Sequence, residues 1–341
     1  MVSLSNQGHW FGGQTGRAEV CWVTPLAVDD AVLSWELELG LVRLASGQVT
    51  LNRDQAATCI DVPVPSVRAR TAMRWTYCVM DPGGTATLAV GFEEIHVYPE
   101  NLLAGVGPRL AGRTLTICDG ADGLPRTLTL AGIPHVRVER DATALNTLET
   151  LRGDIIVVGP NWLTESPFSQ AAFLNQARSG CSVFLFAQTH VRQLAGYALL
   201  RRPPPGRLEW RLDHPLLAGF LTGDVEEWVR RPGEDVWAVQ MPADEAAFEV
   251  VYWSPMTRGR EPVPIDALML VQRVGAGRIV LCQLPPMSWN EDPRAQVLLR
   301  NALDYLLTRP EPTPRPSERV TTRPVWLRRE PEITVPSGGR P

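Results

Sequence analysis

The sequence predicts an immunoglobulin-like β-sandwich followed by a flavodoxin-like doubly wound α/β domain. Its 341 residues are a length typical of two domains. In the N-terminal third, apolar and polar residues alternate, which indicates strands with one face in water. Further along the chain, short apolar runs carry no charge. Such runs indicate strands of a parallel sheet that is covered on both faces.

The sandwich is predicted over residues 17–98, after an irregular N-terminal segment at residues 1–16. The clearest strand is Val32–Leu39, in which apolar residues alternate with Ser34, Glu36 and Glu38. Similar segments are separated by turn signals such as Asp81–Gly84. About seven short strands of this kind are typical of an immunoglobulin-like sandwich. Trp35 and Trp75 are expected in its core.

The α/β domain is predicted over residues 113–308, after a linker at residues 99–112. Two uncharged strands, Ile155–Val158 and Ser182–Ala187, flank a helix that begins at Pro167, as in a right-handed βαβ unit. Residues 201–264 are predicted to be largely irregular, with short strands near Val236–Gln240 and Phe248–Trp253. The Pro- and Arg-rich residues 309–341 are predicted to be a disordered tail. The other predicted elements are strands at Thr114–Cys118 and His135–Glu139, helices at Leu124–Ala131 and Ala142–Leu151, a hairpin of Ala267–Val274 with Arg278–Leu284, and a closing helix at Pro293–Leu307 capped by Asp292.

The composition excludes several functional classes. A net charge of −4 means that the chain lacks the excess of basic residues that is typical of nucleic-acid-binding proteins. The chain contains no Lys. P-loop phosphate binding and Schiff-base catalysis are therefore excluded, because both require the amino group of a Lys side chain. The six cysteines form no C-x-x-C pair, so the sequence carries no zinc or redox signature. No metal and no cofactor is expected.

The cysteines also indicate the cellular compartment in which the protein is expected. Reduced thiols, no signal peptide and no membrane-spanning run together predict a cytoplasmic protein without membrane contact. A Cys59–Cys78 disulfide and a segment upstream of Met1 remain open.

Candidate ligand-binding residues follow the predicted parallel strands, because doubly wound sheets bind ligands beyond the carboxyl ends of their strands. The aromatic rings of two of them suit the apolar face of a sugar, so a saccharide is the expected ligand. Two carboxylates in Asp119–Gly123 would repel a phosphate. The candidates are Asp119, Asn161, Trp162, Gln188, His190 and Trp289.

Each candidate also has a structural interpretation. Asp119 can cap a turn or a helix. Trp162 and Trp289 can pack against the neighbouring domain. His190 is a candidate general base, but the sequence supplies neither a nucleophile nor an orienting acid beside it.

The order of strands resembles a class I glutamine amidotransferase-like domain over roughly residues 112–307. Those enzymes carry a nucleophilic Cys on a sharp elbow after the strand that matches Ser182–Ala187. Here Ala187 and Gln188 occupy the elbow, and Cys181 lies at the other end of the strand. The late His-x-Glu of that family is also missing, since no His follows His214. The resemblance therefore implies the fold without the activity.

A second resemblance covers most of the chain. The segments that carry it include Val20–Val23, Leu33–Leu37, Ile95–Pro99, Asp213–Leu216 and Gly277–Leu284. Together they look like the C-terminal half of bacterial glycoside hydrolases of the family 2 β-galactosidase type. In that family the catalytic carboxylates lie on an upstream (β/α)₈ barrel, which has no counterpart in this sequence.

The second resemblance implies a non-catalytic accessory region of a carbohydrate-active enzyme, acting in assembly or in contact with saccharide. Its implied partners are a saccharide, a glycoside hydrolase catalytic domain or a second copy of the chain. Two alternatives stay open. One is a hydrolase that uses Asp119, Gln188 and His190. The other is a stand-alone domain pair that binds a small ligand.

Overall fold

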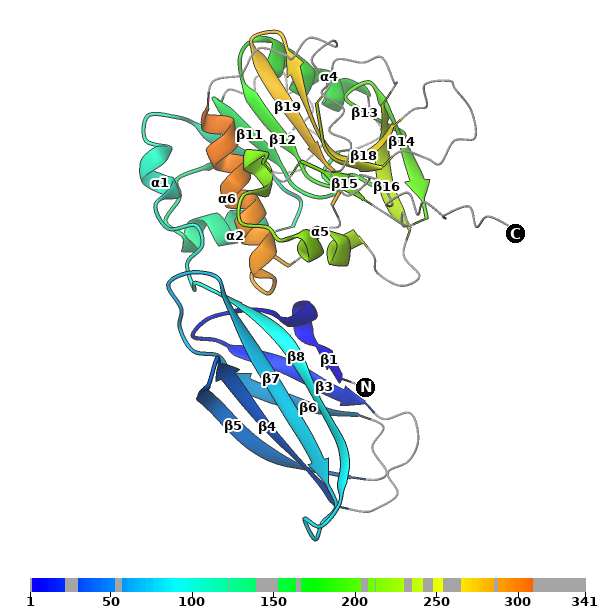
Figure 1. Ribbon diagram of the computed structural model, residues 1–341. Coiled ribbons are helices and arrows are strands. Elements are labelled where there is room, and N and C mark those ends of the chain that lie inside the picture. Colours follow the sequence, from blue (N-terminus) through cyan, green and yellow to red (C-terminus); the bar gives the residue numbers. More distant parts are fainter. Residues whose placement is uncertain are drawn as a thin grey trace, which may run out of the picture.

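The chain is richer in strand than in helix and forms three sheets (Figure 1). The computed structural model describes residues 2–21, 30–52, 57–121, 123–138, 153–163, 167–203, 208–211, 213–229, 235–241, 248–253, 265–284 and 288–308. The helix expected at Ala142–Leu151, the tail after residue 308 and Asp122 lie outside these ranges.

Two sheets form from the N-terminal part of the chain and share one core. The three-stranded sheet has the order β1-β3-β6, and the five-stranded sheet has the order β2-β8-β7-β4-β5. Leu33, Trp35 and Trp75 of the larger sheet pack in one cluster with Val20 and Ile60 of the smaller one. The alternation along the sequence therefore marks the buried side of each strand. The strands are β1 (Val2–Leu4), β2 (His9–Phe11), β3 (Thr15–Cys21), β4 (Ala31–Leu39), β5 (Val42–Leu51), β6 (Ala57–Pro63), β7 (Thr71–Met80) and β8 (Thr87–Tyr98).

The third sheet is mixed and has eleven strands, with the main order β10-β9-β11-β12-β19-β18-β16-β14-β13. The strands from β10 to β19 in this order run parallel to one another. From β18 onward the pairing is antiparallel. The strands are β9 (Leu115–Cys118), β10 (Val136–Val138), β11 (Ile155–Val158), β12 (Ser182–Leu185), β13 (Gln193–Leu194), β14 (Tyr197–Arg202), β15 (Glu209–Trp210), β16 (Val236–Met241), β17 (Phe248–Trp253), β18 (Ile265–Val274) and β19 (Gly277–Cys282).

Helices cover both faces of the parallel strands, which explains their uninterrupted apolar runs. Leu128 of α2 and Leu298 of α6 belong to the cluster on one face, and Phe173 of α4 belongs to the cluster on the other. Helix α6 begins where predicted, because the Asp292 carboxylate accepts a hydrogen bond from the Arg294 amide at 2.9 Å. The helices are α1 (Val106–Arg109), α2 (Gly123–Leu130), α4 (Pro167–Arg178), α5 (Thr222–Val229) and α6 (Pro293–Leu307), with 3₁₀ turns η1 (Ser5–Gly8) and η2 (Pro215–Leu217).

Three segments differ from the sequence-based expectation. Residues 1–16, expected to be irregular, contain β1, η1, β2 and the start of β3. Residues 99–112, expected to be a linker, contain α1 with a fully buried Val106. Residues 201–264, expected to be largely irregular apart from short strands near Val236–Gln240 and Phe248–Trp253, contain β16 and β17 at those two positions and also α5 and β15. Strands β1, β2 and β15 have only two or three residues, which is too short for a period to show, so sequence alone could not indicate these three strands.

The cysteines are all free thiols, so Cys59 and Cys78 do not pair. Within the part of the chain that the structure describes, no helix has both the length and the apolar character needed to cross a bilayer.

Candidate functional site

The carboxyl ends of β9, β11 and β12 meet at one edge of the mixed sheet and bring three predicted residues together. Asp119 follows β9, Asn161 follows β11 and Gln188 follows β12. Gly159 lies between them. A Cβ atom on Gly159 would lie 2.5 Å from Asp119 Oδ1, and the Gly159 carbonyl accepts a hydrogen bond from Gln188. The absence of a side chain at Gly159 therefore lets the carboxylate approach the backbone closely.

Asp119 is a buried helix-capping residue. Only 1% of its surface is exposed. Its Oδ1 accepts a hydrogen bond from the Ala121 amide and its Oδ2 accepts one from the Leu124 amide, each at 3.2 Å. The Leu124 amide lies in the first turn of α2, where backbone donors otherwise lack partners, and Ala121 precedes the helix. The carboxylate thus fulfils the capping interpretation.

Gln188 ties three strand ends together. Its Oε1 accepts from the Leu163 amide at 2.9 Å, and its Nε2 donates to the carbonyls of Gly159 at 2.9 Å and Phe186 at 2.6 Å. Its own amide donates to Gln283 Oε1 at 3.1 Å, at the end of β19. Gln188 is 1% exposed. Its side chain therefore has both polar atoms occupied by the protein itself.

Asn161 holds the next loop in place. It has a left-handed backbone conformation with φ of 53°. Its Oδ1 accepts hydrogen bonds from the Thr189 amide at 2.7 Å and the Thr189 hydroxyl at 2.9 Å. His190 follows Thr189 and is exposed. The structure thus places the candidate base at the surface, directly after Thr189, which is held by its hydrogen bonds to Asn161.

Trp162 and Trp289 lie on opposite faces of the sheet. Trp162 is 3% exposed and meets Phe173 of α4 edge to face, with ring centroids 6.0 Å apart. Trp289 is 9% exposed and meets Phe186 edge to face at 4.9 Å, in the cluster that includes α2 and α6. The two rings therefore do not form one platform, and each packs beside an aromatic residue of the mixed-sheet part of the chain, whereas the structural interpretation expected contacts with the neighbouring domain.

The thiols near this edge are not activated nucleophiles. Burial raises the pKa of Cys118, at the end of β9, to about 12. Burial also raises the pKa of Cys282 to about 12. Cys181 lies at the start of β12, where its Sγ donates to the Gly153 carbonyl at 2.8 Å, and burial raises its pKa too. A reactive thiol requires a lowered pKa. Among the described residues, no cluster of His, Cys, Asp and Glu side chains could hold a metal ion.

A cavity of about 610 Å³ lies between α4 and the β13 hairpin, and its lining begins at Val191, the residue after His190. It is lined by Gln170, Ala171, Leu174, Val191, Arg192, Gln193 and Gly196. The Gln170 side chain bridges its two walls, because Nε2 donates to the Gln193 carbonyl at 2.7 Å and Oε1 accepts from the Ala195 amide at 3.3 Å.

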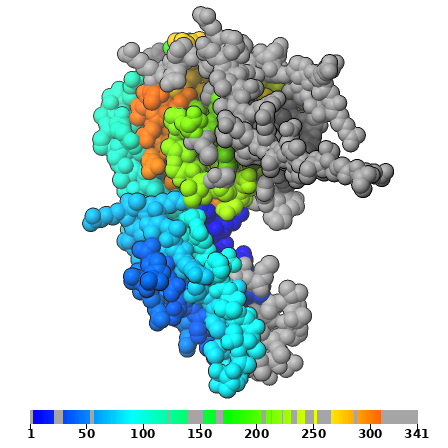
Figure 2. Space-filling view, viewed as in Figure 1, coloured from blue at the N-terminus to red at the C-terminus, as the bar shows by residue number. Residues whose placement is uncertain are grey.

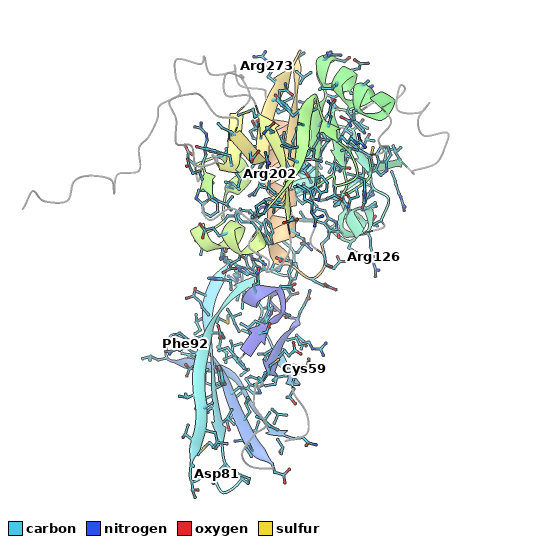
Figure 3. All side chains as sticks on the ribbon, turned by 90° about the vertical axis from the view of Figure 1, so that its right-hand side faces the viewer. Cys59, Asp81, Phe92, Arg126, Arg202 and Arg273 are labelled. Atoms are coloured by element: carbon cyan, nitrogen blue, oxygen red, sulfur yellow. The ribbon has the colours of Figure 1, made fainter. Side chains whose placement is uncertain are left out.

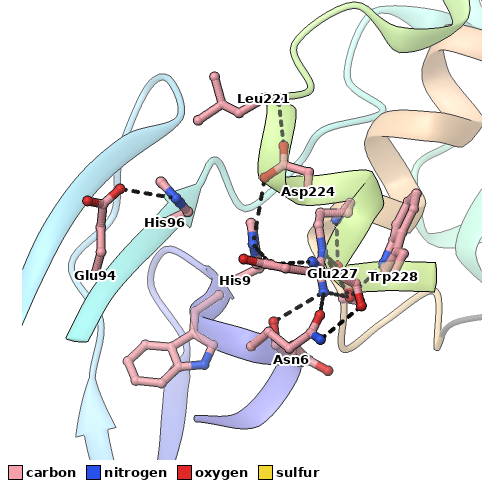
Figure 4. A network of polar contacts seen from close by, with 12 residues as sticks. Asn6, His9, Glu94, His96, Leu221, Asp224, Glu227 and Trp228 are labelled. Atoms are coloured by element: carbon pink, nitrogen blue, oxygen red, sulfur yellow. Dashed lines mark hydrogen bonds and ion pairs between the residues drawn. The ribbon is translucent and has the colours of Figure 1, made fainter. Parts of the chain in front are cut away.

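A second polar cluster joins the sandwich to the mixed sheet, and sequence reasoning missed it (Figure 4). We call it the junction cluster, and it consists of Asn6, Gln7, His9, Arg70, Tyr98, Asp224, Glu227, Asp292 and Arg294. His9 is 1% exposed and lies between the two parts. Its Nδ1 is 3.0 Å from the Tyr98 hydroxyl, and its Nε2 is 3.3 Å from Glu227 Oε2. The sequence signal at Asp292–Arg294 indicated only the start of a helix.

Arg294 is the most buried charge of the junction cluster, with no exposed surface. Its guanidinium donates to Asp292 Oδ2 at 2.8 Å and to Gln7 Oε1 at 3.0 Å, and it also contacts Glu227 at 3.3 Å. The Asn6 carbonyl accepts another hydrogen bond at 3.3 Å. This single side chain therefore binds residues from η1, α5 and α6.

Asp224 and Arg70 form the other ion pair of the junction cluster. Arg70 donates to both carboxylate oxygens, at 2.5 and 2.9 Å, and the Leu221 amide donates to Oδ2 at 2.7 Å. Burial alone would raise the pKa of Asp224. The hydrogen bonds from Arg70 and Leu221 outweigh burial and lower that pKa below its ordinary value. The carboxylate is therefore charged at neutral pH and fixed to the sandwich.

Comparisons with known proteins identify no family. No protein-family model matches the chain. The ribosome biogenesis protein erb1 of Emericella nidulans is 30% identical over 114 residues, which is 33% of this chain. The chain spans only 13% of the length of that protein.

Similarity to solved structures is weak. A ThuA-like protein from Parabacteroides merdae aligns with 57% of this chain and 89% of its own, at 10% identity and a TM-score of 0.32. A β-galactosidase from Rahnella sp. R3 aligns with 59% of this chain and 33% of its own, at 11% identity and a TM-score of 0.30. A superoxide reductase from Ignicoccus hospitalis covers 28% of this chain with a TM-score of 0.22. Because all these scores are low, none of the similarities carries an argument about fold or function.

Proposed function

We propose that this chain is a non-catalytic accessory region of a carbohydrate-active enzyme of the β-galactosidase type, and that its role is assembly. One observation supports this best: the protein itself engages the side chains of Asp119, Asn161 and Gln188 at the carboxyl edge of the sheet. Asp119 caps α2, and Gln188 joins the ends of β11, β12 and β19. A catalytic acid or base must reach a substrate atom. Asp119 and Gln188 are instead buried and hydrogen-bonded to backbone groups, so they stabilise this edge of the sheet.

The carbohydrate setting rests on the sequence resemblance described above, with its immunoglobulin-like sandwich and degenerate amidotransferase-like domain. Of the two roles that this resemblance implies, assembly fits the geometry better than saccharide contact. Trp162 and Trp289 pack in separate cores, so neither ring has a free face to stack on a sugar. The junction cluster supports the assembly role, because it connects the sandwich and the mixed-sheet part into one rigid unit that could hold a neighbouring domain at a fixed distance.

The catalytic alternative is tested by turnover. The purified chain is expected to cleave no nitrophenyl glycoside and to release no glutamate from glutamine. Titration with mono- and oligosaccharides is expected to leave Trp fluorescence unchanged, equally in the wild type and in a Trp162→Phe variant. Turnover that disappears in Asp119→Asn, or saturable sugar binding that disappears in Trp162→Phe, would show that the edge is a working site.

The accessory role itself requires a positive test. An affinity-tagged copy, purified from its native cells and analysed by mass spectrometry, is expected to contain a glycoside hydrolase barrel. The barrel can be on the same polypeptide or on a separate subunit. A homogeneous preparation without any carbohydrate-active protein would contradict the proposal.

A further inference from the structure

The N-terminal half of β8 is an open edge of the five-stranded sheet. Strand β7 pairs with β8 from Thr87 to Val97, with one register shift beside Leu88. On the other side, β2 pairs only with His96, Val97 and Tyr98. No other described strand joins β8, so the backbone groups from Thr87 to Glu93 on this side face no strand in the described part of the chain. Figure 1 shows this half of β8 reaching toward the end of the sandwich that lies far from the mixed sheet.

The open edge carries exposed apolar side chains. Leu88 is 42% exposed, Val90 is 74% exposed and Phe92 is 59% exposed. Figure 3 shows Phe92 on the outer side of the sandwich, opposite to Cys59, and in Figure 2 this part of β8 forms the surface at the distal end. The Arg74 guanidinium lies 4.0 Å from the Phe92 ring centroid. Val90 faces Cys78 of β7, and Met80 faces Thr87 across a register shift that leaves Leu88 without a directly opposed residue on β7.

Edge strands of natural proteins usually carry charges that prevent pairing with another chain. This edge does not, because residues 82–92 contain no charged residue. Its sequence is also self-complementary: Leu88-Ala89-Val90-Gly91-Phe92 places two large apolar residues around two small ones, with Val90 at the centre. An antiparallel two-fold pairing centred on Val90 sets Leu88 against Phe92 of a second copy and Ala89 against Gly91.

The neighbouring charges select this register. Glu93 and Glu94 follow Phe92 directly. A parallel pairing would place these carboxylates beside those of the second copy, and like charges on facing positions are destabilising. The antiparallel pairing places them at opposite ends of the ladder, where Glu93 faces Thr87.

We propose that β8 pairs antiparallel with β8 of a second copy of this chain, centred on Val90. The two five-stranded sheets then continue into one sheet across the two-fold axis. Main-chain hydrogen bonds join the edges, and the apolar pairs on the outer face set the register. This interface does not depend on the carbohydrate role, because it requires neither a ligand nor a catalytic partner.

Sedimentation equilibrium of the full chain tests the proposal. The wild type is expected to be a dimer at tens of micromolar. Val90→Lys places two ammonium groups on the axis and removes two buried valines, so we expect it to raise the dimer dissociation constant about a hundredfold. Val90 is 74% exposed in the single chain, so the variant should keep the wild-type melting temperature. Amide hydrogen exchange should show protection of residues 88–92 that increases with concentration in the wild type alone.

The matched control is Val136→Lys. Val136 is 55% exposed on β10, an edge strand of the mixed sheet. This variant is expected to remain a dimer. A wild type that stays monomeric at several hundred micromolar would overturn the proposal. So would a dimer that survives Val90→Lys, or one that dissociates only in Val136→Lys.

Discussion

His214 shows how burial sets the charge of one side chain. Its ring is 9% exposed and lies against Tyr305 of α6, with centroids 5.1 Å apart. Its Nδ1 accepts a hydrogen bond from the Leu216 amide at the start of η2. Burial lowers the pKa of His214 to about 4. Of the smaller effects on this pKa, the charge of Asp213 raises it and the charge of Arg211 lowers it further. The neutral ring is therefore part of the folded state.

A pH titration of stability tests this. Because the folded pKa lies below the unfolded value of about 6.5, the unfolded chain binds the proton first and stability falls as pH is lowered from 6.5 toward 4. Between pH 7 and pH 5 the loss through His214 should be about 2 kcal/mol. His96, whose pKa burial also lowers, adds a loss of the same sign.

The variant for this test is His214→Asn, whose amide oxygen can still accept the Leu216 hydrogen bond. We expect its free energy of unfolding, measured in urea, to depend less on pH than that of the wild type over this range. The exposed His190 provides the control, since His190→Asn should keep the wild-type slope. Equal slopes in all three proteins would show that His214 is protonated while folded.

At the scale of the element, the start of α6 combines a helix cap with an ion pair. Asp292 accepts from the Arg294 amide and pairs with the Arg294 guanidinium, so both residues are buried with few unmet hydrogen bonds. A buried ion pair contributes little by itself, but breaking one leaves a charge without a partner. Substitutions at the start of α6 are therefore expected to lower the stability of the fold strongly.

Arg294→Ala is expected to lower the free energy of unfolding by about 3–5 kcal/mol, because Asp292 would remain buried and unpaired. Chemical denaturation measures the change. Arg300→Ala, in the same helix but half-buried, is the control and should cost about 1 kcal/mol or less. A similar loss in both variants would mean that the effect belongs to the helix rather than to the ion pair.

Elements with a long periodic pattern were predictable from the sequence, and those defined by distant contacts were not. Strand β4 and helix α6 matched their predictions because their own residues carry the period and the cap. Strand β2 has three residues and all are buried, so no alternation marks it. It forms because β8 supplies its pairing partner.

In the candidate site, too, the position of each residue was predictable from the sequence, but its contacts were not. Its residues could be placed at strand ends from the order of elements, and Asp119, Asn161 and Gln188 do lie together. Their hydrogen bonds to nearby amides could not be predicted, because an Asp or Gln that binds a ligand has the same local sequence as one that binds backbone. Which face each Trp ring occupies depends likewise on helices that are distant in sequence.

At the scale of the whole molecule, the junction cluster couples the sandwich to the mixed sheet. Asp224 of α5 binds Arg70 near the start of β7, while Arg294 of α6 binds Gln7 of η1. The first contact is an ion pair and the second joins a guanidinium to a neutral amide, and both are at least partly shielded from water, so screening by salt weakens them little. The sandwich and the mixed sheet are therefore expected to unfold together.

Scanning calorimetry of the wild type should show one transition. Asp224→Ala leaves Arg70 without its carboxylate at the contact between the two parts, so their unfolding should separate into two transitions. Asp304→Ala removes a surface ion pair with Arg109 and is expected to keep a single transition. One transition in the Asp224 variant would contradict the coupling.

The hydrogen bond between Arg294 and the Asn6 carbonyl has a consequence for synthesis of the chain. The two residues are 288 positions apart. At about 5–20 residues per second, a ribosome takes roughly 15–60 s to make the intervening segment. During that interval the sandwich can already have formed, with His9 and Asn6 in water. The contact that closes the molecule is thus among the last to form, and a nascent chain that stalls before α6 would present these residues to the chaperones of the cell.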